Sequence, residues 1–226
     1  MSLLPSTPAG LTVPADAAEL GAIFSALGLP PQPAQLAMLS GYLDLLQRWN
    51  ATYNLTAVRE RSAMLSQHLA DCLALIGPLQ RHRSVGRLLD VGSGGGLPGV
   101  VVAALLPQMD VTCVDAVGKK VAFVRQVAGA LQLSNLHASH ARVEDLKLAP
   151  FDLITSRAFA TLELFVRLTE KHLADGGVWL AMKGLTPEDE MAALPPSVEV
   201  FHVEQLVVPT LAAQRCLVWM RRRQPT

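Results

Sequence analysis

The chain has 226 residues, 50% of them hydrophobic, which suffices for one fair-sized core or for one core with a small appendage. Its 19 basic and 19 acidic residues balance, so it lacks the basic excess of a protein that coats nucleic acid, and any contact with RNA has to come from a local patch. The longest apolar run, Val100 to Leu106, is far too short to span a membrane, and no basic segment precedes an apolar stretch at the amino terminus. The three cysteines lie far apart without metal-ligand spacing, so we expect no metal and a protein of the reducing cytoplasm.

The first part of the chain predicts helices. Residues 1–18 are rich in proline and small side chains and carry almost no charge, which is typical of a loosely ordered lead-in. Apolar residues then recur at steps of three and four from Ala18 to Leu27, from Pro33 to Trp49 and from Ser62 to Leu79. We therefore expect an N-terminal helical segment over residues 19–83.

After Gly86, short apolar strands alternate with intervals long enough for a helix. This alternation predicts an α/β domain over residues 84–226, with a parallel sheet covered by helices on both faces. The tail instead holds two strand-like runs, Val198 to Val208 and Arg215 to Met220, which predict an antiparallel closing hairpin. The predicted parallel strands are Leu88 to Val91, Val111 to Asp115, Phe151 to Ile154 and Val178 to Met182.

The first of these strands runs into a glycine-rich loop, Asp90-Val91-Gly92-Ser93-Gly94-Gly95-Gly96. Glycines allow a tight turn and let a ligand approach main-chain atoms, and Pro98 suits the start of the apolar helix that follows. The loop alone is compatible with two cofactors, S-adenosylmethionine and NAD. Read from Gly94, it satisfies the dinucleotide fingerprint, with Asp115 as the acidic residue about 20 positions further on. Both cofactors have a ribose that Asp115 can bind.

Asp90 separates the two cofactors. The position before the first glycines is usually apolar in nucleotide-binding dehydrogenases, whereas an acidic residue two places ahead of G-x-G-x-G is the usual methyltransferase arrangement. The methionine part of S-adenosylmethionine carries cationic groups, which a nearby carboxylate attracts. We therefore favour this cofactor over NAD, and an NAD-linked oxidoreductase would also need a substrate domain that the chain lacks. A glycine turn without a ligand is the remaining alternative.

Seven ordered blocks of residues point to one family. They are Trp49-Asn50 with Tyr53 to Thr56, His68 to Asp71, Leu89 to Gly99, Asp115 with Gly118 to Phe123, Ala141 to Glu144, Ser156 to Ala160 and Met182 to Gly184. Through these blocks the chain resembles the RsmG (GidB) family, bacterial methyltransferases of guanine N7 in 16S ribosomal RNA. The resemblance implies a Rossmann-like class I methyltransferase fold, with a mostly parallel seven-stranded sheet and the antiparallel C-terminal hairpin.

The resemblance also implies a site for S-adenosylmethionine, with S-adenosylhomocysteine as the product. Gly92 and Leu97 would contact the cofactor through the loop, and Asp115 would bind its ribose hydroxyls. Val143 and Glu144 would flank the adenine. The full implied set of cofactor-binding residues is Asp90, Gly92, Gly94, Gly96, Leu97, Asp115, Val143, Glu144 and Arg157.

The implied reaction needs alignment rather than acid-base chemistry, because guanine N7 has a free lone pair and bears no proton. Asn54, His68 and Arg157 are the candidates for positioning a splayed-out base. Asn54 could instead cap a helix, and His68 could tie its helix to the sheet. Arg157, at the carboxyl edge of the sheet, could instead pair at the surface with Asp152 or Glu144.

A neutral chain needs a local basic patch to hold RNA. The candidate RNA-binding residues are Lys119, Lys120, Arg125, Arg142 and Lys183. A solvated helix face is the alternative for the lysines, and the run at 221–223 is either a nucleic-acid tail or only solubilising. We expect 16S ribosomal RNA or the small ribosomal subunit as the partner of a monomer. A non-enzymatic assembly factor on the same fold is the competing function.

Overall fold

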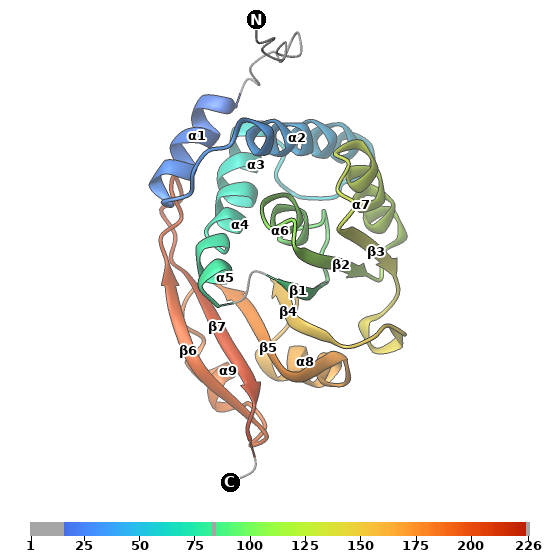
Figure 1. Ribbon diagram of the computed structural model, residues 1–226, viewed down its shortest axis with the longest axis vertical. Coiled ribbons are helices and arrows are strands. Elements are labelled where there is room, and N and C mark those ends of the chain that lie inside the picture. Colours follow the sequence, from blue (N-terminus) through green and yellow to red (C-terminus); the bar gives the residue numbers. More distant parts are fainter. Residues whose placement is uncertain (1–15, 83–84, 225–226) are drawn as a thin grey trace, which may run out of the picture.

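A computed structural model describes residues 16–82 and 85–224, so most of the predicted lead-in lies outside the described residues. Within the described chain, seven strands form one sheet in the order β3-β2-β1-β4-β5-β7-β6 (Figure 1). Strands β1 to β5 run parallel, and β7 pairs antiparallel with both β5 and β6, which confirms the predicted architecture. The strands are β1 Gly86–Val91, β2 Met109–Asp115, β3 Leu136–His140, β4 Phe151–Arg157, β5 Leu173–Lys183, β6 Val198–Leu206 and β7 Arg215–Arg222.

Helices bury both faces of this sheet. In β1, Leu88 joins a core that includes the N-terminal helices, α6 (Gly99–Leu105) and α7 (Gly118–Ala130), whereas Leu89 joins a second core with α8 (Leu162–Thr169). Successive side chains of a strand point to opposite faces, so a strand covered on both sides has to be apolar throughout. This is why the central strands appear in the sequence as continuous apolar runs.

The N-terminal helices pack against one face of the sheet and share its core (Figure 1). They are α1 Ala17–Ala26, α2 Pro33–Tyr53, α3 Arg61–Met64, the π-helix η1 Leu65–Ala70, α4 Asp71–Leu73 and α5 Ile76–His82. The expected single helix from Ser62 to Leu79 is wrong in one respect, because the helical run ends at Leu73. Pro78 has no N–H to donate to Ala74, so the old helix cannot continue through it, and it lies instead in the first turn of the new helix, which begins at Ile76.

Two elements are not predicted by the sequence, β3 and the short helix α9 (Glu188–Ala192). Only Leu136 of β3 is fully buried, because this strand lies at the edge of the sheet, and α9 has no buried residue at all. Neither element therefore has an apolar period to detect. None of the helices in the described ranges is long and apolar enough to cross a membrane.

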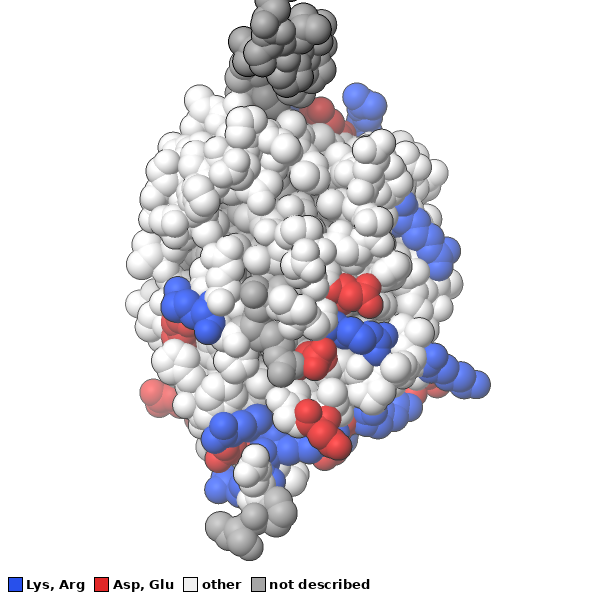
Figure 2. Space-filling view, viewed as in Figure 1, with Lys and Arg blue, Asp and Glu red and all other residues white. Residues whose placement is uncertain are grey.

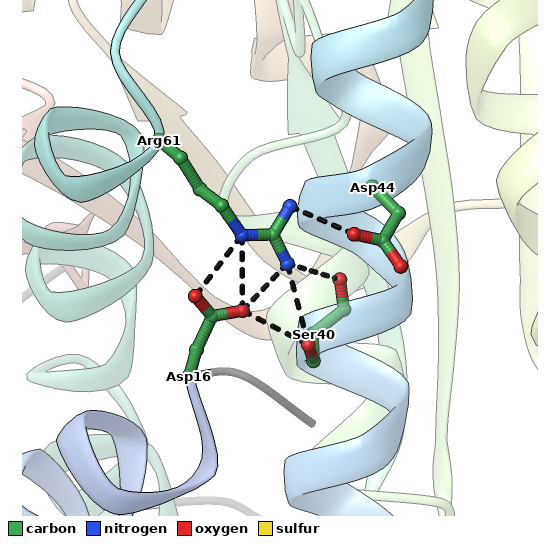
Figure 3. A network of polar contacts seen from close by, with 4 residues as sticks. All are labelled: Asp16, Ser40, Asp44 and Arg61. Atoms are coloured by element: carbon green, nitrogen blue, oxygen red, sulfur yellow. Dashed lines mark hydrogen bonds and ion pairs between the residues drawn. The ribbon is translucent and has the colours of Figure 1, made fainter. Parts of the chain in front are cut away.

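Arg61 joins three parts of the helical segment (Figure 3). Its Nε lies 3.0 and 3.1 Å from the two carboxylate oxygens of Asp16, which directly precedes α1. The same guanidinium pairs with Asp44 of α2 at 2.8 Å, and the hydroxyl of Ser40 donates to Asp16 at 2.9 Å. The hydrogen bond from Arg61 lowers the pKa of Asp16. The contacts of Arg61 with Asp16 and Asp44 therefore hold α1 against α2 and fix the start of α3.

We expect Arg61→Gln to lower the free energy of unfolding by about 1 to 3 kcal/mol at pH 7, because Asp16 is left largely buried without its cation. Because the pKa of Asp16 is lowered in the folded protein, this contribution is present above pH 4 or so and is lost as the pH falls further. Urea denaturation at several pH values measures both effects. Arg48→Gln, at an exposed position of α2, is the control. An equal loss in both variants, or a loss independent of pH, would contradict the assignment.

Candidate active site

A cavity of about 510 Å³ opens at the carboxyl ends of β1, β2 and β4. Its walls come from residues 91–92, 114–116, 141–144 and 158–159, with Lys120 and Leu168. Strand β2 lies on one side of β1 in the sheet, and β4 lies on the other side, so the strand order reverses at β1. Ligands of open α/β sheets bind outside the carboxyl ends of the strands at such a reversal of strand order.

Two glycines of the loop after β1 have no room for a side chain. Gly92 has a φ of 65°, and a β-carbon there would lie 2.5 Å from the ring of Phe159. Gly96 has a φ of 82°, and a β-carbon there would lie 2.7 Å from Val100. The backbone conformation and the close neighbours both require glycine at these positions, as the spacing of the motif predicted.

Two buried side chains hold the loop from outside the cavity. The hydroxyl of Tyr42, on α2, donates to the carbonyl oxygen of Gly95 at 2.8 Å. Oδ2 of Asp90 accepts the N–H of Gly99 at 2.8 Å, while its Oδ1 is buried with no hydrogen-bond partner among the described residues. Burial raises the pKa of Asp90 to about 7. Tyr42 is not predicted as a site residue, because its only signal in the sequence is its place in the apolar period of α2.

Asp115, at the end of β2, lies on the cavity wall. Its Oδ2 accepts the N–H of Gly94 at 3.0 Å, and its Oδ1 accepts the N–H of Val117 at 2.8 Å. Nζ of Lys120 lies 3.7 Å from the same carboxylate. A carboxylate has about four acceptor positions, so this one is oriented by the backbone and can still accept hydrogen bonds from a ligand's hydroxyl groups.

Val143 and Glu144 lie on the wall in the short 3-10 helix η2 (Val143–Asp145), which follows β3. The structure thus brings four of the predicted cofactor residues to one cavity. These four are Gly92, Asp115, Val143 and Glu144. The remaining predicted residues do not line the cavity, and they are Asp90, Gly94, Gly96, Leu97 and Arg157.

Arg157 pairs with Asp71, so the surface pairing with Asp152 or Glu144 considered from the sequence is wrong. Its guanidinium lies 3.3 Å from Oδ2 of Asp71, and Nε of Arg215 lies 2.8 Å from Oδ1 of the same carboxylate. Asp71 is almost completely buried. The sequence could not indicate this pairing, because it depends on how α4 packs against the ends of β4 and β7.

His68 and Asn54 both make contacts within the N-terminal segment. Nε2 of His68 lies 2.8 Å from the hydroxyl of Thr56, its Nδ1 is buried without a partner in the described chain, and burial lowers its pKa. Asn54 ends α2 with a φ of 49° and accepts a hydrogen bond from Arg59 at 3.1 Å. Asn54 therefore does cap a helix, and neither residue lines the cavity.

The predicted RNA-binding cations differ in their surroundings. Lys120 and Arg142 lie on the cavity wall. Lys119 donates to the carbonyl oxygen of Tyr53 at 2.8 Å, and Arg125 donates to that of Ala138 at 3.1 Å. Lys183 is largely buried and lies 2.7 Å from Glu190. Lys183 is therefore engaged inside the protein, whereas Arg142 is highly exposed.

The basic run near the C-terminus contacts the rest of the protein. Arg221 pairs with Glu199, Arg222 donates to the carbonyl oxygen of Leu173 at 3.1 Å, and Arg223 donates to that of Pro196 at 3.0 Å. Figure 2 shows basic and acidic side chains mixed over the lower end of this face of the molecule. In residues 16–82 and 85–224, no three His, Cys, Asp or Glu side chains are grouped so that they could hold a metal ion.

Residues 35–218 match the family model GidB, described as rRNA small subunit methyltransferase G. The ribosomal RNA small subunit methyltransferase G of Acidovorax sp. (strain JS42) is 56% identical over 207 residues, which cover 87% of this chain and 91% of that protein. The protein of the same name from Bordetella pertussis is 50% identical over 232 residues and 99% of both chains.

Among solved structures, coclaurine N-methyltransferase bound to N-methylheliamine and SAH superposes with a TM-score of 0.53 at 16% identity. The match covers 82% of this chain and 61% of that chain, and at this identity it shows the shared fold alone. The family match spans most of the chain, and relatives about half identical in sequence cover nearly all of it. The chain therefore belongs to the GidB family, rRNA small subunit methyltransferase G.

Proposed function

We propose that the protein transfers the methyl group of S-adenosylmethionine to N7 of a guanine in 16S ribosomal RNA of the small subunit. The observation that carries the proposal is the cavity where Gly92, Asp115 and the pair Val143-Glu144 come together. The name shared by the relatives supports ribosomal RNA of the small subunit as the acceptor, and methyl transfer by the family supports a donor of this type.

The order of the strands indicates how the cofactor lies. Val143 and Glu144 follow β3 and Asp115 ends β2, so the adenine and ribose would bind on this side of the sheet. From there the sheet continues through β1 to β4. The methionine half, with the sulfonium methyl group, would therefore lie toward residues 158–159 on the opposite wall.

Alignment supplies the catalysis in this proposal. The N7–methyl bond forms as the sulfur–methyl bond breaks, with no proton to remove, so the lowered pKa of the half-buried His68 is no obstacle. We assign Asn54, His68 and Arg157 to positioning the acceptor. Arg157 supports this role because it ends β4, next to the methyl end of the cavity.

We propose that RNA binds beside the cavity, at basic side chains on α7 and after β3. Lys119, Lys120 and Arg125 lie on α7, and the exposed Arg142 follows β3, to which α7 packs closely. These cations would hold phosphates without making the whole molecule basic. All the walls of the cavity come from one chain. We propose that the protein acts as a monomer.

The proposal predicts that calorimetry detects binding of S-adenosylmethionine and S-adenosylhomocysteine and none of NAD. Methyl-tritiated cofactor should label small subunits, or 16S RNA, from bacteria that lack this methyltransferase. Strand cleavage specific for 7-methylguanine should then locate the label at one guanine. Binding of NAD alone, or transfer to protein instead of RNA, would contradict the proposal.

Asp115→Asn should weaken cofactor binding by roughly 10- to 100-fold, because a charged acceptor for the ribose hydroxyls is lost. Asp110→Asn is a matched control on the same strand, since Asp110 is half exposed and pairs with His137 away from the cavity. The dissociation constants are measured by calorimetry, and thermal midpoints verify that both variants are folded. Equal affinities for the two variants would remove Asp115 from the site.

Asp90 supports the loop by accepting the N–H of Gly99. Its burial is tested by the dependence of protein stability on pH. The raised pKa means that folded Asp90 holds a proton between about pH 4 and 7 that the unfolded chain has lost, so its contribution to stability falls as the pH rises through this window. Asp90→Asn has no such proton and should gain several degrees in thermal midpoint relative to the unaltered protein between pH 5 and about 8. Parallel pH profiles of the two proteins would contradict the assignment.

A further inference from the structure

Phe159 is the aromatic residue on the cavity wall among the residues that the structure describes. Its ring covers Gly92 at a distance that only glycine permits, and it meets the ring of Phe165 edge-on at 6.5 Å. Ala158, directly before it, has a φ of 54°, a conformation that alanine rarely adopts. Strained backbone of this kind is concentrated at functional sites.

The backbone after Phe159 is held by a partly buried ion pair. Nζ of Lys183 donates to the carbonyl oxygen of Ala160 at 2.9 Å and pairs with Glu190 at 2.7 Å. The same carboxylate of Glu190 accepts the N–H of Leu162 at 2.8 Å. Lys183 thus fixes the segment that carries Phe159, rather than serving as the RNA contact predicted from the sequence. Phe159 is therefore a positioned ring rather than part of a loose loop.

Phe159 also lies at the end of the cavity where the acceptor has to enter. The adenine and ribose occupy the side formed by β2 and β3 in the proposed function, which leaves the wall at 158–159 next to the methyl group. The ring is only partly buried, so it has apolar surface that a flat ligand can cover. Adenine is on the other side, so the flat ligand on this side is the acceptor.

We propose that Phe159 stacks on the acceptor guanine and so selects a base that is splayed out of the RNA. This inference rests on the proposed function. Unpaired bases are commonly recognised by stacking on an aromatic side chain. Aromatic residues make up only 5% of the chain, too few for the row of stacking rings that single-strand binders use. One positioned ring would instead stack on one base.

The ring also contributes to the reaction itself. When N7 takes the methyl group, the sulfur keeps the electron pair of the broken bond and becomes a neutral thioether, while the positive charge moves to the purine. A cation is attracted to the face of an aromatic ring, so the contact with Phe159 strengthens as the charge develops. An interaction that is stronger in the transition state than in the ground state raises kcat.

The test compares Phe159→Leu and Phe159→Met with Phe159→Trp in single-turnover methyl transfer to unmethylated small subunits and 16S RNA. We expect the Leu and Met variants to lose about tenfold or more in kcat/KM for RNA, with a loss in kcat, while Phe159→Trp stays within about threefold of the unaltered protein. Calorimetry should find the affinity for S-adenosylhomocysteine within about twofold in all variants. Phe201→Leu, on β6 and outside the cavity wall, is the matched control and should keep full activity.

Full activity of a folded Leu or Met variant would overturn the inference, and so would a loss that comes entirely from weaker cofactor binding. A loss in Phe159→Trp as large as that in Phe159→Leu would overturn it too, because it would indicate a need for shape rather than an aromatic face. If the unaltered protein transfers no methyl group to RNA, the proposed function fails, and this inference fails with it. Transfer by the unaltered protein with no effect of Phe159→Leu rejects the stacking alone.

Discussion

The arrangement of the site depends on one buried carboxylate. Asp71, in the N-terminal helical segment, lies between Arg157 of β4 and Arg215 of β7. A charge in the interior is tolerated only when it is paired, and removing one partner of such a pair costs several kcal/mol. The ion pairs therefore fix three parts of the chain relative to one another: the helices, the strand end at the cavity and the closing hairpin.

The glycine-rich loop is held by hydrogen bonds from three parts of the chain. Tyr42 binds Gly95 from α2, Asp90 binds Gly99 from β1, and Asp115 binds Gly94 from the end of β2. A site that is already ordered loses little conformational freedom when its ligand binds. Such order would serve the proposed methyl transfer to guanine N7, in which alignment replaces acid-base chemistry, because the geometry is built into the backbone.

Much of the fold could be predicted because its signals are local. The apolar runs at 88–91 and 178–182 indicate buried strands, and the glycine spacing locates the loop. Contacts between distant segments could not be predicted. The partner of Arg157 and the hydrogen bond from Tyr42 depend on how the helical segment packs on the sheet. Lys183 resembles an RNA contact in the sequence, because its pairing with Glu190 is formed only in the folded protein.

The shared core of the helices and the sheet has a consequence for how the protein unfolds. Leu217 and Trp219 of β7 belong to the same apolar cluster as Leu20 of α1 and Leu43 of α2. Stripping the helices away would expose that face of the sheet to water and leave the carbonyl oxygen of Gly95 without its donor. The glycine-rich loop is thus part of one cooperative unit with the helices, and a substitution that disturbs the packing of α2 would reach the loop through the core rather than through the cavity.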